Sequence, residues 1–196
     1  MSTEAPTKSE QRASARERLL AAANELFYAE GVQTVGIDRI IERAGVAKAS
    51  LYNLFGSKEE LEAAYLATQH EATTRKLTEA IEKFNDPREK VLAVFDCQAK
   101  QFKQPDFRGC AFVAASTEAP PGGLVERAAD DFRAWIRAMF IDLLEQAGAP
   151  DPKSLGRQLH ILYDGAGLAA RMDHRDPAIA RSARGAAETL LDAALS

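Results

Sequence analysis

Residues 31–61 read GVQTVGIDRIIERAGVAKASLYNLFGSKEEL and contain two short helical patterns separated by a tight turn. Ile37, Ile40, Ile41 and Ala44 recur at the i, i+3, i+4 and i+7 spacing of a single apolar helix face. Gly45 follows as a stop, because glycine adopts the left-handed conformation without steric cost. A second short helix is expected three residues later. Two helices joined by a turn of three or four residues that contains glycine form a helix-turn-helix.

The second of these helices carries side chains suited to nucleic acid. In a helix-turn-helix the second helix enters the major groove of DNA. Lys48 and Lys58 are cations for phosphates, and Ser50 and Tyr52 carry hydroxyls that can bond phosphate oxygens. Asn53 can read adenine with both atoms of its amide. The spacing alone is equally compatible with two amphipathic helices of an ordinary bundle, whose polar side chains are simply solvated.

A longer run of residues at fixed offsets separates these readings. It consists of a Gly-Val turn, a pair of small residues, Leu-Tyr, two variable positions, an aromatic residue and a Ser-Lys-Glu-x-Leu helix start. In this chain the corresponding residues are Gly45-Val46, Ala49-Ser50, Leu51-Tyr52, Asn53-Leu54, Phe55 and 57–61. The run resembles the DNA-binding domain of TetR-family transcriptional regulators. It covers about a quarter of the chain, so it is specific but local.

The resemblance implies a ligand-responsive regulator, in the simplest case a repressor. Such a protein binds a palindromic double-stranded DNA operator as a homodimer and is released by a small-molecule effector. Three positions depart from the family pattern: Gly36 and Ala47 stand where a hydroxyl residue is usual, and Leu54 replaces a polar residue. Two phosphate-contacting hydroxyls and one candidate for base contact are therefore missing. These departures affect the expected operator, not the class of protein.

Composition predicts a cytoplasmic globular protein with no membrane partner. The chain has 196 residues, of which 46% are hydrophobic and 28% charged. It contains no apolar run long enough to span a bilayer, and the first residues have no signal-peptide core. The net charge of −4 argues against nonspecific coating of DNA, but residues 36–58 alone carry +2. A small, salt-sensitive DNA footprint is therefore expected.

Helix start and stop signals along the rest of the chain predict an all-α fold of nine helices without strands. Ser14-x-x-Glu17 and Ser57-x-x-Glu60 are capping boxes that open helices. Three Asp-Pro dipeptides, at 86–87, 151–152 and 176–177, open three more. By role, the chain is expected to divide into a flexible tail (1–13), a three-helix DNA-binding domain with the helix-turn-helix (14–57) and a helical ligand-binding and dimerisation domain (58–196).

The last two predicted helices, at about 153–172 and 177–195, are rich in small residues, which let helix axes approach closely. Such a pair could pack within one chain or against its own copy. The resemblance favours the second reading, because TetR-like proteins usually dimerise through their last two helices. The predicted dimer interface comprises Leu159, Gly165, Ala166, Ala169, Leu190 and Leu191.

The central helices hold most of the aromatic residues. The resemblance implies an effector pocket among them, and such pockets are mostly apolar with a few polar groups. The candidates are Phe95, Phe102, Trp135 and Tyr163, with His160 as a polar handle. Each of these side chains is also compatible with a purely structural place in the core.

Parts of the sequence are also compatible with two other classes of function. His160 and Asp164 lie one turn apart and could form half of a metal site, but no third ligand follows at a readable spacing. The chain shows no catalytic motif, so neither enzymatic activity nor a cofactor or metal is expected. Cys97 and Cys110 are expected to be reduced thiols. The remaining alternative is a helical adaptor that binds only protein, which would not need the polar residues Tyr52 and Asn53.

Overall fold

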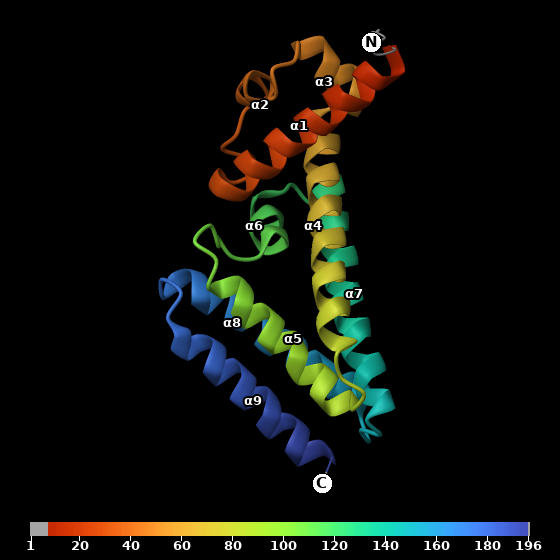
Figure 1. Ribbon diagram of the computed structural model, residues 1–196, viewed down its shortest axis with the longest axis vertical. Coiled ribbons are helices and arrows are strands. Elements are labelled where there is room, and N and C mark those ends of the chain that lie inside the picture. The colour runs from red at the N-terminus through yellow and green to blue at the C-terminus, as the bar shows by residue number, and fades with distance from the viewer. Residues whose placement is uncertain (1–7, 196) are drawn as a thin grey trace, which may run out of the picture. The chain divides into compact units, whose positions relative to one another are not determined.

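The computed structural model describes residues 8–195, with side chains over 14–117 and 119–195. This part of the chain forms nine α-helices and no strand, which confirms the predicted all-α fold (Figure 1). The helices are α1 (Lys8–Glu30), α2 (Ile37–Ala44), α3 (Lys48–Phe55), α4 (Lys58–Ile81), α5 (Pro87–Phe102), α6 (Ala111–Glu118), α7 (Leu124–Gln146), α8 (Pro152–Met172) and α9 (Pro177–Leu195). No helix of the described residues is both long enough and apolar enough to cross a membrane.

Most predicted helix boundaries are confirmed by their capping bonds. The Ser57 hydroxyl accepts a bond from the Glu60 backbone N–H at 3.1 Å. The carboxylates of Asp86, Asp151 and Asp176 each accept a backbone N–H two or three residues ahead, at 2.8–3.0 Å. Gly45 has φ +62°, so it ends α2 in the left-handed conformation that was expected of a glycine stop.

Two predicted boundaries were wrong. The first helix does not start at the Ser14 capping box but runs through it from Lys8. Residues 8–13 include good helix formers and no glycine or proline, so nothing in that stretch stops the helix. The helix that opens at the Ser57 capping box is predicted from the sequence to run to about Phe84, but α4 ends at Ile81. The Phe84 N–H bonds the Ile81 carbonyl at 3.2 Å in the turn that follows. The predicted tail lies outside the described residues up to residue 7, and the rest of it is helical.

The chain forms two compact units. The first comprises residues up to 68 together with 114–128. In it α1 packs against α2 and α3 around a core that includes Leu19, Ile40 and Leu51, each fully buried. Phe27 of α1 and Tyr65 of α4 meet at 5.5 Å between ring centroids. This core sets the relative positions of the two helices of the helix-turn-helix.

The second unit comprises residues 69–113 and those from 129 onward. Helices α5, α8 and α9 lie side by side in it (Figure 1). Gly156 lets α8 approach α7 closely, because a Cβ there would come within 2.9 Å of the Ile141 side chain. Helix α4 belongs to both units, which divide after Thr68. The division by role at residues 57 and 58 stays a prediction.

Candidate nucleic-acid interface

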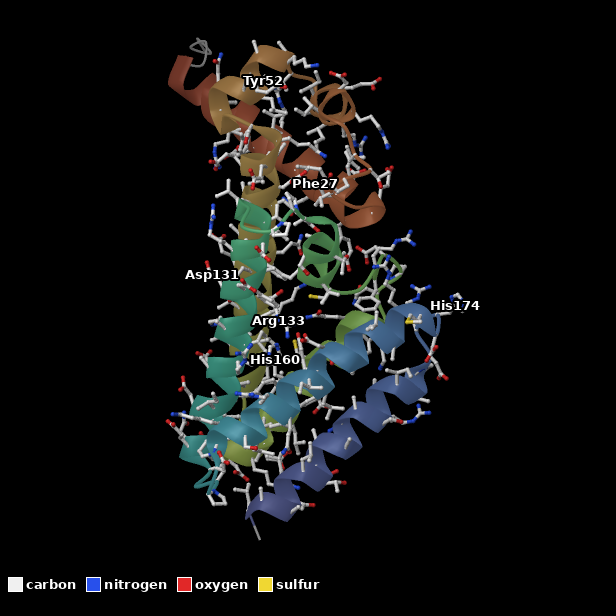
Figure 2. All side chains as sticks on the ribbon, turned by 180° about the vertical axis from the view of Figure 1, so that it is seen from behind. Phe27, Tyr52, Asp131, Arg133, His160 and His174 are labelled. Carbon is white, nitrogen blue, oxygen red and sulfur yellow. The ribbon has the colours of Figure 1, made fainter. Side chains whose placement is uncertain are left out.

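Helix α3 has one buried side and one exposed side. Leu51 is fully buried against the core of the first unit. Lys48, Tyr52 and Asn53 are exposed; Lys48 and Tyr52, four residues apart, share one face of the helix, and Asn53 follows Tyr52 on the exposed side. Figure 2 shows Tyr52 on α3, where 45% of the residue is exposed. Ser50 is half-buried and borders this face. Four of the five predicted DNA contacts therefore lie on or beside one exposed surface, which we call the α3 face.

Carboxylates of the chain pair with basic residues of the helix-turn-helix, including Lys48 of the α3 face. Lys48 Nζ lies 2.9 Å from Asp38 Oδ1, and the hydrogen bond to this carboxylate raises the pKa of Lys48. Arg39 pairs in the same way with Glu30, at 2.5 Å. These pairs are exposed and contribute little to stability, so a phosphate can replace the carboxylate at low cost.

Lys58, the fifth predicted DNA contact, is directed into the protein. Its Nζ donates a hydrogen bond to the Val32 carbonyl at 2.6 Å and lies 3.2 Å from Glu62 Oε1. It also lies 5.9 Å from the ring centroid of Phe27. Glu62 is only 4% exposed, so the ammonium neutralises a buried carboxylate. In the structure Lys58 thus ties α4 to the chain segment before α2, and its contact with a phosphate stays a prediction.

Sequence reasoning missed two structural supports of this interface. Glu62 could have been found, because it lies four residues after Lys58, the spacing of a helical ion pair. The other support is Arg16, whose guanidinium carbon lies 5.0 Å from the ring centroid of Phe55 and so links α1 to α3. No local pattern indicates that second contact.

A partly buried polar cluster lies in the second unit. Arg133 Nη1 of α7 lies 2.6 Å from Asp164 Oδ2 of α8, and His160 Nε2 lies 3.4 Å from the same oxygen. Figure 2 shows Arg133 and His160 close to each other. Burial lowers the pKa of His160, while the charge of Asp164 acts in the opposite direction. The sequence indicated the His160–Asp164 pair but not Arg133.

The predicted pocket residues fall into separate aromatic groups. Phe95 and Tyr163 pack together, with ring centroids 6.3 Å apart, and both are buried. Phe102 instead contacts Phe107 at 5.1 Å. Trp135 belongs to a third group, which was not anticipated. Its other members are His70, Phe112 and Phe132.

The predicted dimer residues are divided between the core and the surface of the second unit. Leu159, Ala166 and Leu191 are buried within the chain itself, and their place in a dimer interface stays a prediction. Ala169 and Leu190 are half-buried. Gly165 is exposed, and a Cβ added to it would meet no atom within 4 Å.

Three large apolar residues of α8 that were not predicted are exposed instead. Ile161, Leu168 and Met172 are 64%, 51% and 67% exposed. Together with Gly165 they follow the i, i+4, i+7, i+11 spacing of one helix face, which we call the α8 stripe. The spacing is visible in the sequence, but the same residues could equally have formed a core face.

The described side chains contain no group of three or more His, Cys, Asp or Glu residues that could hold a metal ion. His160 and Asp164 therefore gain no third ligand of these types within that part of the chain.

Both cysteines are free, and burial raises the pKa of each thiol. The polar cluster provides hydrogen-bonding groups and charge, which suit recognition of a ligand.

Comparison with known proteins gives a consistent picture. Residues 19–65 match the family model described as "Bacterial regulatory proteins, tetR family". The crystal structure of a TetR-family transcriptional regulator from Streptomyces coelicolor is 35% identical and superposes with a TM-score of 0.88, covering 94% of this chain and 97% of that one. The transcriptional regulator LmrA of Bacillus subtilis is 29% identical over 71% of this chain and 76% of its own length. The transcriptional repressor NemR of Escherichia coli K12 is 32% identical over 53% of each.

Proposed function

The chain belongs to the TetR family of bacterial transcriptional regulators, and from this premise we propose that it is a repressor. It binds a palindromic operator as a dimer, and a small-molecule effector releases it from the DNA. The single observation that carries the proposal is the α3 face. It places Lys48, Tyr52 and Asn53 together on the exposed side of the second helix of a helix-turn-helix. Because the family consists of non-enzymatic regulators, we drop the helical-enzyme alternative.

We assign two kinds of contact to the α3 face. Lys48, Ser50 and Tyr52 bond phosphate oxygens and fix the position of the helix in the groove. Asn53 lies on the same face and reads a base edge through its amide. Leu54 is half-buried at the border of the face, where its methyl groups can meet the methyl group of a thymine. Lys58 stabilises the DNA-binding domain without contacting DNA.

We propose the α8 stripe, together with the neighbouring surface of α9, as the dimer interface. Ile161, Leu168 and Met172 supply exposed apolar area, and Gly165 lets a second helix approach closely. The resemblance to the family supports this choice over other surfaces. A dimer of this kind would present two α3 helices about 34–36 Å apart, which is one turn of DNA.

For the effector we propose a site beside the polar cluster of Arg133, His160 and Asp164. The aromatic group around Trp135 would supply apolar contact area. Helix α4 runs through both compact units as one continuous helix, so we propose it as the lever between effector and DNA. The effector would bind more tightly to an arrangement in which the two α3 helices no longer match the operator.

Selection of bound sequences from a pool of random DNA duplexes tests the proposal. A dimeric repressor should enrich an inverted repeat whose half-sites are about one turn apart. The selected duplex should then bind more tightly than a scrambled duplex at the same salt concentration. If the pool is not enriched and the chain binds no duplex at 50 mM salt, the adaptor alternative replaces the regulator.

A further inference from the structure

A cavity of about 480 Å³ lies in the second compact unit, between the last turns of α4 and the end of α5. Its volume is in the range of sites that take small metabolites. The cavity does not include Arg133, His160 or Asp164, so it is distinct from the effector site proposed above. The lining residues are Lys76, Glu79, Ala80, Lys83, Cys97, Lys100, Gln101, Gln104 and Asp106.

The lining of this cavity holds more basic than acidic side chains, although the chain as a whole has a net charge of −4. Lys76, Lys83 and Lys100 face two carboxylates, so the cavity carries a local charge of +1. Among the described residues, no carboxylate oxygen lies within 4.0 Å of any of these three ammonium groups. Around the α3 face, by contrast, the basic side chains are paired. Three cations around one cavity therefore have no carboxylate partner within the described part of the chain.

The positive field reaches the buried wall of the cavity. Cys97 forms part of that wall, and its thiol lies 3.7 Å from the Lys76 carbonyl. Burial raises the pKa of Cys97, while the charges of Lys100, Lys76 and Lys83 act in the opposite direction. The three lysines and this thiol line the same cavity, so a bound anion would lie near all three ammonium groups.

We propose that this cavity binds a multiply charged organic anion of metabolite size, either a phosphate ester or a polycarboxylate, held by Lys76, Lys83 and Lys100. Two or three negative charges are needed to engage three cations. Gln101 and Gln104 add amide side chains that can donate hydrogen bonds to the anion. Glu79 and Asp106 interrupt the basic surface, which favours a compact anion over a long polyanion such as nucleic acid.

Calorimetric titration of the full chain with citrate and with pyrophosphate tests this site. At least one of the two anions should bind with saturation at 1:1 stoichiometry per chain. Lys76→Gln and Lys100→Gln should each weaken binding about fivefold, the upper limit for a single exposed ion pair. Glu79→Gln should strengthen it by a similar factor, since that change removes an opposing charge. All three side chains are exposed, so the variants should fold normally.

Matched control variants distinguish specific binding of the anion in the cavity from its general electrostatic attraction to the protein. Lys153→Gln and Glu145→Gln change exposed residues of the same unit outside the cavity and should leave the affinity unchanged. The proposal is overturned if neither anion binds, or if the control variants alter binding as much as the cavity variants do. It is also overturned if only DNA or heparin competes for the lysines. None of these results would affect the proposed regulator function, which rests on the α3 face.

Discussion

Replacement of Lys58 by methionine distinguishes a structural lysine from a phosphate clamp. Methionine keeps an unbranched apolar stem that is one atom shorter and removes the ammonium group. In the folded chain that group lies 3.2 Å from Glu62 Oε1 and donates to the Val32 carbonyl at 2.6 Å. The Glu62 side chain is only 6% exposed, and that of Lys58 is 26% exposed. The substitution therefore removes a cation from beside a buried carboxylate.

The expected cost follows from this burial. Removing one partner of a fully buried ion pair costs about 3–5 kcal/mol. Lys58 keeps partial contact with water, and Glu62 has further interactions in the chain, so we expect a loss of about 2–3 kcal/mol. For a chain of this size, that loss corresponds to a decrease in Tm of about 5–10 °C. Lys58→Met combined with Glu62→Gln should recover part of the loss, because the buried charge is then removed as well.

Urea unfolding followed by circular dichroism measures these differences in wild type, both single variants and the double variant. The coupling energy should be at least about 1 kcal/mol. Binding to the selected operator, measured at several salt concentrations below the unfolding temperature, should keep the wild-type salt slope. The reasoning is refuted if Lys58→Met unfolds within about 0.5 kcal/mol of wild type while its salt slope becomes shallower by about one. That result would return Lys58 to the DNA interface.

Three further predictions follow from the positions of Asn53, Gly165 and His160. Asn53→Ala should cost about 1–3 kcal/mol on the operator and little on random DNA, and an equal loss on both duplexes would make Asn53 a positioning residue. Gly165→Leu should leave the stability of the monomer intact, because no atom lies within 4 Å of the added Cβ, but should weaken the dimer by about 1–3 kcal/mol in sedimentation. A wild-type chain that is monomeric at micromolar concentration would contradict the proposed interface. Burial lowers the pKa of folded His160, so the unfolded chain binds more protons at this residue, and the corresponding stability is present above pH about 6.5 and lost as the pH falls. Unfolding measured from pH 7.5 to 5 should therefore lose stability less steeply in His160→Gln, and identical pH profiles would contradict this account.

Local signals in the sequence determined the helices and the position of the helix-turn-helix. The Gly45 stop, the Ser57 cap and the three Asp-Pro starts each depend on hydrogen bonds or backbone preferences that span four residues or fewer. Such signals act in the same way whatever the rest of the chain does. One exception was Ser14, where a valid capping pattern lies inside a longer helix because the residues before it also favour helix.

Only the tertiary structure decided which side chains are available for function. Lys58 was expected at the DNA surface, but its ammonium group bonds a carbonyl 26 residues earlier in the chain. Leu159 and Ile161 lie two residues apart on the same helix, yet the first is fully buried and the second is 64% exposed. The periodicity of a helix defines its faces without specifying what covers each one. The side chains that pack against a helix face belong to segments distant in sequence, so the burial of that face is determined only when the whole chain folds.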